Sequence, residues 1–378
     1  MKILIVTQHY PPDLGAVSFR FEGLVHELVH RHHDVYVLTA QPNRYTDYEV
    51  PTYDYEGYQI KTLQINTRYA STFQRVKGFL AFYVKVLREA KTYRDKAIDV
   101  VVSTTPYLLE GLAGQKLARK LKAKHLLDVR DLWPDTAIAL GKISSFGPTA
   151  MFLRSMEKTL YKKAHRITVT SPGYIDHIQK KATTPIAVVY NGIDESLFKS
   201  THQYQDSSSI HIVYAGNIGV AQNLITLVRA AQHLDSSHYH ISLVGSGSQL
   251  KDIKTFIKKQ GLTNVSLHPP IAREHMVALY EAADILFLQL FNSPYFYKVI
   301  PSKIFEYLVT DKPIVYGLDG VSKTILQQYP RTYSFKPDDV NDLIRAIQQV
   351  DLQHVKRDCA SLYRKTQSQN FVKVIEEI

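Results

Sequence analysis

Short apolar, β-branched runs alternate with segments of helical periodicity along this chain, and the alternation occurs twice. In the first half Lys2–Thr7 is such a run, apolar residues at helical spacing follow over Phe19–His30, and Val35–Leu38 is the next run. Consecutive strands joined through helices lie parallel, and helices then cover both faces of the sheet. The pattern therefore predicts an α/β fold with parallel, doubly wound sheets.

A second series of the same kind fills the rest of the chain. Its expected strands are Ala187–Tyr190, Ile210–Tyr214, Ile241–Val244, Val265–Leu267, Ile285–Leu288 and Pro313–Tyr316. A chain of 378 residues exceeds what one core normally holds, so two domains are expected. We place the boundary at Ser171-Pro172-Gly173. Ligands of such sheets bind beyond the carboxyl ends of the strands, which suggests a cleft between the halves.

The positive charge of the chain is concentrated in its first half. Residues 1–172 hold 25 Lys and Arg against 16 Asp and Glu, whereas the remainder holds 21 against 19. This excess indicates an anionic partner, either nucleic acid, membrane phospholipid or a phosphorylated lipid. Residues 75–96 combine an apolar helical face with basic side chains, as expected for a helix that rests on an anionic membrane. A core-covering helix with a solvated basic side would give the same pattern.

Several classes of protein are disfavoured by what the sequence lacks. The single cysteine, Cys359, excludes a disulfide framework and fits a reducing compartment. The start of the chain does not have the form of a signal peptide, and no run approaches the ~18 apolar residues of a membrane span. We therefore expect a cytoplasmic protein. Neither an Asp-x-Asp pair nor zinc-site spacing occurs, so no metal is expected, and no nucleic-acid-binding motif is present.

The stretch Phe296–Gly317 places polar residues at the mouth of an otherwise apolar helix. Pro301, Ser302 and Lys303 open the helix, and Glu306 follows about one turn later. A helix N-terminus with an adjacent lysine suits a phosphate, and a carboxylate there could hold paired hydroxyls such as those of a ribose. The alternative is that Glu306 only complements the helix dipole, which contributes at most about 1 kcal/mol on a surface.

Two glycine-containing loops follow expected strands of the second half. They are Ala215–Gly219 and Gly245-Ser246-Gly247. Such loops allow a backbone to approach a ligand, but they also form ordinary tight turns between a strand and a helix. Neither is a complete G-x-G-x-x-G fingerprint, which argues against a nicotinamide dehydrogenase.

The segment Asp128–Asp135 (DVRDLWPD) gathers three carboxylates, Arg130 and the only tryptophan, Trp133, directly after a strand. Polar residues at strand ends beside a cleft are candidates for chemistry. A local ion-pair network with a packed tryptophan would explain the same residues.

Together these segments resemble the GT-B-fold retaining glycosyltransferases of family 4. The resemblance extends over nearly the whole chain and depends on KILIVTQHYPPDLGAVSFR, HDVYVLT, DVRDLWPD, TVTSPG, VVYNGID, YAGNIGVAQNL, LVGSGSQ and PSKIFEYLVTDKPIV. The forms DLWPD, GNIGVAQ and PSKIFEY are most similar to capsule, O-antigen and exopolysaccharide transferases, including those that transfer N-acetylfucosamine.

The resemblance implies two Rossmann-like domains facing across a cleft. Residues 1–172 would bind the acceptor and residues 173–359 the nucleotide-sugar, while a helix at 360–378 would return to the first domain. Glu306 would hold the ribose, and Ser302 and Lys303 would face the diphosphate. The other residues implied on the donor side are Gly15, Asn217, Gly219, Gly245, Gly247, Ile271 and Arg273.

The chain departs from the family pattern at two places. The family often has a second glutamate eight positions before the first, where this chain has Lys298, and many members carry an Arg and a Lys after the strand matching Ile210–Tyr214, where this chain has GNIGVAQN. We therefore expect Lys303, with Lys298, to supply the missing positive charge.

On the acceptor side, Arg130 occupies the position of a histidine near the reacting sugar. With Asp131, Lys303 and Glu306 it completes the set of residues expected at the reaction centre. Arg20, Asp128, Trp133 and Lys298 are expected near the acceptor.

The resemblance thus implies retaining, metal-independent hexosyl transfer from a UDP-sugar to a polyprenyl-diphosphate-linked saccharide in surface polysaccharide synthesis. No cofactor is expected beyond the donor substrate. The basic first domain would place the enzyme peripherally on the inner face of the cell membrane. The alternatives are an enzyme similar to UDP-N-acetylglucosamine 2-epimerase and a non-catalytic, nucleotide-binding scaffold of a polysaccharide assembly complex.

Overall fold

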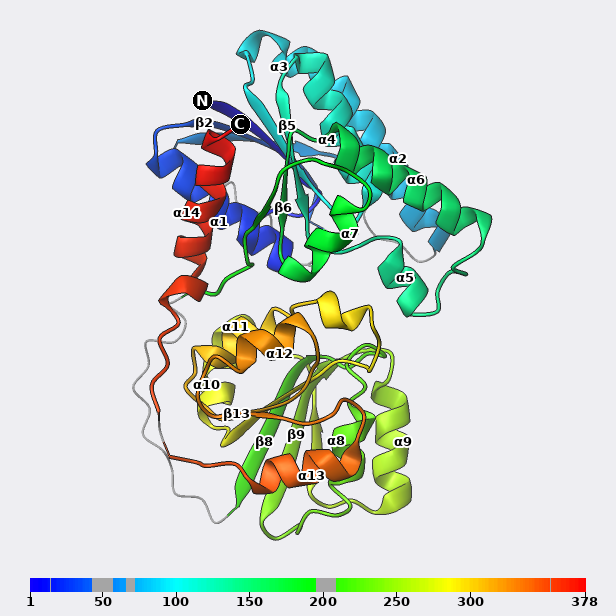
Figure 1. The fold of residues 1–378 in the computed structure, drawn as a ribbon, viewed down its shortest axis with the longest axis vertical. Helices are drawn as coiled ribbons and strands as arrows, with labels where there is room; N and C mark the ends of the chain where they lie inside the picture. Colours follow the sequence, from blue (N-terminus) through cyan, green and yellow to red (C-terminus); the bar gives the residue numbers. More distant parts are fainter. Residues whose placement is uncertain (14, 43–56, 66–71, 195–208, 354) are drawn as a thin grey trace. The chain divides into compact units, whose positions relative to one another are not determined.

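The computed structural model describes the chain except for residues 14, 43–56, 66–71, 195–208 and 354, and it leaves the side chains of residues 72, 73, 273 and 274 undescribed. The chain forms two compact units (Figure 1). Unit 1 comprises Met1–Gly192 and Ser361–Ile378, and unit 2 comprises Ile193–Ala360. Among the described residues no helix combines the length and the apolar character needed to cross a membrane.

Unit 1 is built on a seven-stranded parallel sheet in the order β3-β2-β1-β4-β5-β6-β7. The strands are β1 (Lys2–Val6), β2 (Asp34–Ala40), β3 (Tyr58–Leu63), β4 (Val100–Thr104), β5 (Lys124–Val129), β6 (Arg166–Val169) and β7 (Ile186–Val188). Strand order runs outward in both directions from the β1/β4 pair. This pair is therefore the topological switch point, where open parallel sheets bind their ligands.

Helices cover both faces of this sheet. One face carries α1 (Ala16–His30) and the C-terminal helix α14 (Arg364–Glu376), which pack against each other. The other face carries α2 (Thr72–Arg88), α4 (Leu108–Leu121) and α6 (Pro148–Lys163). Residues of β1 alternate between the two cores, with Ile3 and Ile5 packed under α1 and α14 and with Leu4 and Val6 packed under α2 and α4. This explains why every residue of β1 after Lys2 is apolar.

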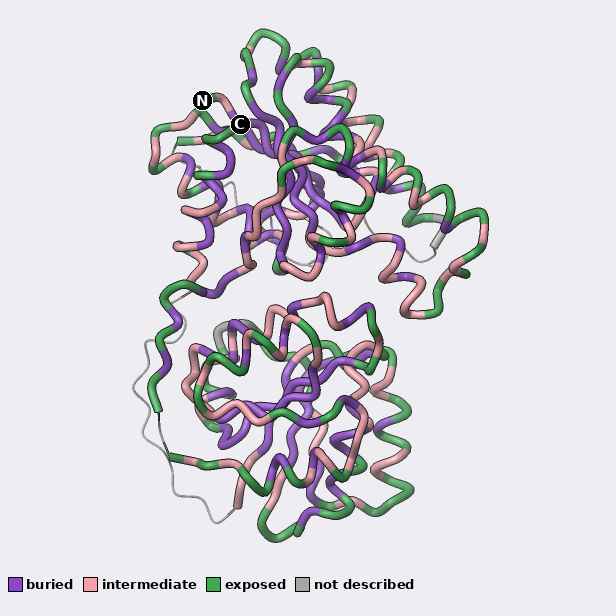
Figure 2. The backbone as a smooth tube through the Cα atoms, viewed as in Figure 1, coloured by how far each residue is buried: buried purple, intermediate pink, exposed green. Residues whose placement is uncertain are grey.

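Unit 2 contains a six-stranded parallel sheet in the order β10-β9-β8-β11-β12-β13. The strands are β8 (Ile210–Asn217), β9 (Tyr239–Ser246), β10 (Val265–His268), β11 (Ile285–Gln289), β12 (Ile314–Gly317) and β13 (Thr332–Ser334). The helices include α8 (Ile225–Ala230), α9 (Leu250–Gln260), α10 (Arg273–Glu281), α11 (Lys303–Leu308), α12 (Val321–Leu326) and α13 (Val340–Gln348). In both units the central strands are buried, the edge strands are partly exposed, and the outer sides of the helices are exposed (Figure 2).

Two parallel, helix-covered sheets confirm the predicted fold of two Rossmann-like domains. The division of the chain differs in detail from the expectation, because the expected boundary after residue 172 falls inside unit 1. The run Ala187–Tyr190, expected to open the second half, instead supplies β7, which extends the first sheet beside β6. The helix expected at 360–378 is α14, and its packing on α1 explains why the end of the chain belongs to unit 1.

Candidate active site

In unit 2, Lys303 and Glu306 lie together on the first turn of α11. The Lys303 Nζ is 3.5 Å from the Glu306 Oε2, as the i,i+3 spacing on a helix permits. Both side chains are partly exposed, at 18% for Lys303 and 29% for Glu306. Among the described residues the Glu306 Oε1 has no hydrogen-bond partner, so this oxygen can accept a hydrogen bond from a ligand. A carboxylate and an amine therefore lie side by side at a partly exposed place on unit 2.

A buried tyrosine supports this pair from a neighbouring helix. The Tyr280 hydroxyl, from α10, donates a 2.7 Å hydrogen bond to the Glu306 Oε2 and lies 3.4 Å from the Lys303 Nζ. The Tyr280 side chain is fully buried, and burial together with the Glu306 charge raises the pKa of its phenol. The phenol therefore stays protonated and keeps donating, which orients the carboxylate.

The end of β8 also reaches this position. Gly216 has φ +147°, and a Cβ placed on it would lie 2.4 Å from the Lys303 Cε. The absence of a side chain therefore lets the lysine stem lie against the β8 backbone. Strand β8 and its sheet neighbour β11 form the switch point of unit 2, so Lys303 lies beside the expected ligand position of this sheet.

Gly245 lies near the end of β9, where it pairs with the end of β8, and Gly247 directly follows the strand. A Cβ on Gly245 would lie 1.8 Å from the Gly216 carbonyl oxygen, and one on Gly247 would lie 2.3 Å from the Ile218 carbonyl oxygen. Hydrogen bonds join the same two segments, from the Ile218 amide to the Ser246 carbonyl at 2.8 Å and from the Gln249 amide to the Ile218 carbonyl at 3.0 Å. Contact between the two strand ends is thus sufficient to require glycine at 245 and 247.

The remaining residues expected on the donor side are distributed around the same edge. Asn217 is exposed, with its Nδ2 donating to the Gln222 Oε1 at 2.9 Å, and Gly219 lies directly beside it. Ser302 is the N-cap residue of α11, although its side chain makes no capping hydrogen bond. Ile271 is exposed in the loop after β10.

Three other predicted residues are described only in part or lie elsewhere. Arg273 begins α10, but its side chain lies outside the described part of the structure. Lys298 is partly exposed at the end of a short 3₁₀ segment, η4 (Phe296–Lys298). In unit 1, Gly15 is the N-cap of α1, with extended backbone.

In unit 1, Arg20 and Asp128 form a buried ion pair. The Arg20 Nε and Nη2 donate to the two Asp128 oxygens at 3.0 and 2.8 Å, and the Arg20 Nη1 donates to the Val189 and Tyr190 carbonyls. Asp128 accepts a further 2.7 Å hydrogen bond from the Thr168 hydroxyl. The side chains are 3% and 0% exposed, so this pair ties α1 to the strands and presents no surface to an acceptor.

Arg130 and Asp131 lie at the carboxyl end of β5, and Trp133 is partly exposed just after them. The Arg130 Nε is buried and has no hydrogen-bond partner among the residues that the structure describes. Desolvation lowers the pKa of its guanidinium to about 10, although Asp128 raises it. One Asp131 oxygen accepts from the Leu132 amide at 3.0 Å and from the Thr136 hydroxyl at 2.8 Å. Asp131 therefore organises the start of α5 (Asp135–Ala139), whereas Arg130 lacks a matched protein partner for its Nε.

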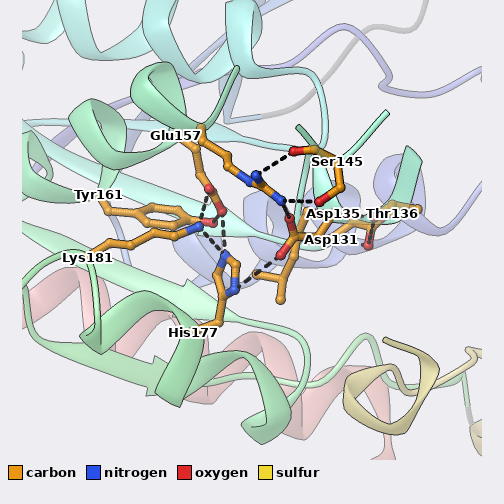
Figure 3. A network of polar contacts seen from close by, with 10 residues as sticks. Asp131, Asp135, Thr136, Ser145, Glu157, Tyr161, His177 and Lys181 are labelled. Atoms are coloured by element: carbon orange, nitrogen blue, oxygen red, sulfur yellow. Dashed lines mark hydrogen bonds and ion pairs between the residues drawn. The ribbon is translucent and has the colours of Figure 1, made fainter. Parts of the chain in front are cut away.

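A polar network fastens α5 to its neighbours (Figure 3). Glu157 of α6 is buried and accepts hydrogen bonds from Tyr161 at 2.9 Å, from the His177 Nε2 at 2.7 Å and from Lys181. The other ring nitrogen of His177 lies 3.5 Å from Asp135. Burial raises the pKa of Glu157, but the contacts with His177 and Lys181 outweigh this effect and lower it. The network holds the DLWPD segment in place beside Arg130.

A second polar cluster, at the β1/β4 switch point of unit 1, was missed by the sequence analysis. Glu110, on the first turn of α4, is 2% exposed, and its Oε1 accepts from the Gln8 amide at 3.1 Å. Burial raises its pKa to about 7, although His9 and Arg130 act to lower it. The His9 Nδ1 donates a 2.9 Å hydrogen bond to the buried Asp13 carboxylate. The available signal was the QHYPPD segment, which supplies three of these residues in one loop.

Models of two known families match the chain. The model of Glycosyltransferase Family 4 matches residues 17–197, and that of Glycosyl transferases group 1 matches residues 200–365. Among curated proteins, the chain is 22% identical to WcaI of Escherichia coli, named as a colanic acid biosynthesis glycosyl transferase, over 75% of each chain. It is 27% identical to TuaH of Bacillus subtilis, named as a teichuronic acid biosynthesis glycosyltransferase, over 52% of this chain and 51% of that protein.

Solved structures with low sequence identity share the fold over the full length. Alr3699/HepE of Anabaena in complex with UDP and glucose has a TM-score of 0.72 at 15% identity, with 100% of both chains covered. Sucrose-phosphate synthase of Thermosynechococcus elongatus has a TM-score of 0.69 at 16% identity, covering 100% of this chain and 94% of that one. With the two family models, which match residues 17–197 and 200–365, this shared fold shows that the chain belongs to the GT-B-fold glycosyltransferases of family 4.

Proposed function

We propose that this protein transfers a sugar from a UDP-sugar to a polyprenyl-diphosphate-linked saccharide, with retention of anomeric configuration, in surface polysaccharide synthesis. The observation that carries the proposal is the exposed Glu306–Lys303 pair on α11, oriented by Tyr280. The names of WcaI and TuaH support a role in polysaccharide synthesis. Structures of HepE with UDP and with UDP-glucose support a uridine nucleotide. The narrower likeness to N-acetylfucosamine transferases stays a prediction.

In this proposal each member of the pair has its own part of the nucleotide. The Glu306 Oε1 accepts hydrogen bonds from the ribose hydroxyls, and the Lys303 Nζ faces the diphosphate. We assign this role to Lys303 because the end of β8 and the residues after it, Gly216–Ala221, offer no basic side chain. Electrostatic stabilisation of a leaving group is often the largest contribution to catalysis, and removal of one good donor typically costs about 3–4 kcal/mol.

The proposed reaction proceeds on one face of the sugar. The acceptor hydroxyl oxygen bonds to the anomeric carbon, the bond from that carbon to the phosphate oxygen breaks, and its electron pair leaves on UDP. The departing phosphate oxygen takes the acceptor proton. Lys303 and helix amides then stabilise the charge of the diphosphate without a metal. On the acceptor side we propose Arg130 and Trp133, held by the DLWPD segment, while Asp131 acts by positioning that segment.

We also propose that the protein works at the inner face of the cell membrane. A lipid-linked acceptor is confined to the bilayer, and the basic residues of unit 1 favour an anionic surface. Binding there would bring the acceptor-binding unit to its substrate.

Calorimetric titration tests the donor assignment with three ligands, UDP, GDP and uridine. We expect UDP to bind more tightly than GDP to the wild type. Glu306→Ala should weaken both UDP and uridine by about 10–100-fold, because it removes charge-assisted hydrogen bonds to the ribose. Lys303→Met should weaken UDP but leave uridine nearly unchanged, because only UDP carries phosphates.

Lys323→Met is the matched control, since Lys323 is an exposed helical lysine of the same unit that also faces a carboxylate, Asp319. Equal UDP binding by wild type and Glu306→Ala would overturn the assignment of the ribose site. Conversion of a UDP-sugar without any acceptor would favour the epimerase alternative. Full complementation by a Glu306→Ala/Lys303→Ala double variant would favour the scaffold.

A further inference from the structure

A basic hollow lies on the outer surface of unit 1, at the junction of α2, α3 (Ala90–Tyr93) and α4. Its volume is about 780 Å³. The apolar side chains that line it are Val84, Leu87 and Ala90, and the polar ones are all basic: Arg88, Lys91, Arg94 and Lys120. The hollow thus combines apolar lining with four positive charges.

The four basic side chains are exposed, and within the described part of the chain none has a hydrogen-bond or ion-pair partner. The neighbouring acid Glu89 does not neutralise them, because its carboxylate is paired with the Lys61 Nζ at 2.5 Å and accepts from the Thr92 hydroxyl. Asp95 is the other acid of this segment, and it is exposed. Four like charges around one hollow repel one another, and an anion bound among them would relieve this repulsion.

An exposed apolar stripe leads along α2 to the hollow. Val76, Leu80 and Val84 recur every fourth residue and are 47%, 48% and 42% exposed. Spacing of four places them on one side of the helix. In the middle of α2, next to Leu80 of the stripe, the Phe79 ring contacts the Tyr107 ring at 4.3 Å between centroids, and Tyr107 directly precedes α4 at the carboxyl edge of the sheet. The stripe therefore extends from the edge that carries Glu110 to the basic hollow.

We propose that α2 is the surface by which this protein lies on an anionic phospholipid bilayer, with a lipid phosphate headgroup in the hollow formed by Arg88, Lys91, Arg94 and Lys120. The stripe Val76, Leu80 and Val84 then enters the headgroup layer beside it, as an interfacial helix does. The inference rests on the proposed function, since it supplies the contact by which a transferase of lipid-linked saccharides reaches its acceptor. The hollow and the stripe identify the lipid-facing residues, whereas the excess charge of unit 1 alone does not identify them.

The experiment is co-sedimentation of the full chain with vesicles. The vesicles are phosphatidylcholine alone, or phosphatidylcholine with about one-third phosphatidylglycerol. We expect binding only to the anionic vesicles, and a fall in binding between about 0.1 M and about 0.5 M NaCl. The quadruple variant Arg88→Gln/Lys91→Gln/Arg94→Gln/Lys120→Gln should bind about 100-fold more weakly, since each basic residue near such a surface contributes several-fold in affinity.

A matched control removes the same charge from another exposed surface of unit 1. This variant is Lys158→Gln/Lys162→Gln/Lys163→Gln/Lys180→Gln, whose four side chains are exposed on α6 and at the end of α7 (Ile175–Gln179). It should bind the anionic vesicles within about threefold of wild type, because these lysines do not line the hollow and exposed charges outside it are partly screened by salt. An equal loss in both variants would overturn the site, because binding would then follow total charge.

A second variant tests the stripe. Leu80→Asn/Val84→Asn should weaken vesicle binding about tenfold while leaving the helical circular dichroism unchanged, because both side chains are exposed. Binding of inorganic phosphate that depends on the four basic residues, without vesicle binding by the wild type, would show a free-phosphate site and overturn the proposal.

UDP titration separates this inference from the proposed function. The quadruple variant should bind UDP as the wild type does. A wild type that binds vesicles but not UDP would contradict the donor assignment and leave the membrane site standing. A wild type that binds UDP but not anionic vesicles would overturn the membrane site alone.

Discussion

Tyr280 and Glu306 belong to different helices, α10 and α11, and the phenol of Tyr280 donates a 2.7 Å hydrogen bond to the Glu306 carboxylate. Tyr280, which donates this hydrogen bond, is fully buried, and Glu306, which accepts it, is partly exposed. The side chain that would meet a nucleotide is thus oriented by one that would not. The same phenol lies 3.4 Å from Lys303, so one buried group contacts both members of the candidate site.

Tyr280→Phe should therefore weaken UDP and uridine alike by about tenfold, because the Glu306 carboxylate loses a hydrogen bond that fixes its orientation. Calorimetry measures both affinities. Tyr316→Phe is the control, since Tyr316 is a buried tyrosine of the same unit on strand β12. Unchanged nucleotide binding by Tyr280→Phe would show that the carboxylate needs no such support.

Gly245→Ala should destabilise unit 2 by about 2–4 kcal/mol, because its Cβ meets the Gly216 carbonyl oxygen and its backbone is in a glycine conformation. Gly261→Ala is the matched control. Its φ is also positive, at +63°, but no atom lies near the new Cβ, so it should cost only about 1 kcal/mol.

Urea unfolding followed by far-ultraviolet circular dichroism measures both glycine variants. The only tryptophan, Trp133, is in unit 1, so its fluorescence provides an internal reference that Gly245→Ala should leave in place. Equal stability of the two alanine variants would mean that unit 2 does not depend on the close contact between the ends of β8 and β9.

Glu110 should make the stability of unit 1 depend on pH between about 4.5 and 7. Its pKa is raised to about 7 in the folded protein, so in this window the folded state binds more protons than the unfolded state. Stability therefore falls as pH rises through the window, and the loss is complete above pH 7. Glu110→Gln should remove this slope and gain roughly 2–3 kcal/mol at pH 8 over the wild type.

The measurement for Glu110→Gln is urea unfolding by Trp133 fluorescence at several pH values. The control is Glu27→Gln, because Glu27 belongs to a partly exposed ion pair with Arg31. It should leave the slope unchanged. A wild type whose stability does not fall between pH 5 and 7 would contradict the raised pKa of Glu110.

Arg20→Met should cost unit 1 about 3–5 kcal/mol, because it leaves the Asp128 carboxylate buried without its partner. Arg31→Met, which breaks two more exposed pairs, with Glu27 and with Glu376, should cost less than Arg20→Met, at about 1 kcal/mol. Trp133 fluorescence in urea compares the two. A stable Arg20→Met variant with lost affinity for acceptor would restore the acceptor role expected from the sequence.

The fold was predictable because burial on both faces of a parallel sheet imposes a simple pattern. Ile3, Leu4, Ile5 and Val6 are all buried, so β1 is an unbroken apolar run after Lys2 and is recognisable in the sequence. The boundary between the units was not predictable from that pattern, since β7 looks the same whether it closes one sheet or opens the next. Only the pairing of β7 with β6 assigns it to the sheet of unit 1, and a pairing between strands cannot be read from the local pattern of apolar residues.

The candidate site was predictable where its residues are local. Lys303 and Glu306 are three positions apart on one helix, so their proximity follows from helical geometry. Arg20 and Asp128 are separated by 108 positions, and no spacing reveals that each neutralises the other. Glu110 was missed for a different reason. A glutamate on the first turn of a helix is normally exposed to solvent, whereas Glu110 is buried against the loop after β1.

The packing of α14 on α1 has a topological consequence. Unit 2 is an insertion within unit 1, since the chain leaves unit 1 after Gly192 and re-enters it at Ser361. Residues 193–360 can be excised as one continuous piece, but unit 1 can be expressed alone only if residue 192 is rejoined to residue 361. A fusion at either end of the chain attaches to unit 1, and trimming the last turns of α14 removes Phe371, Val372 and Ile375 from the core beneath β1.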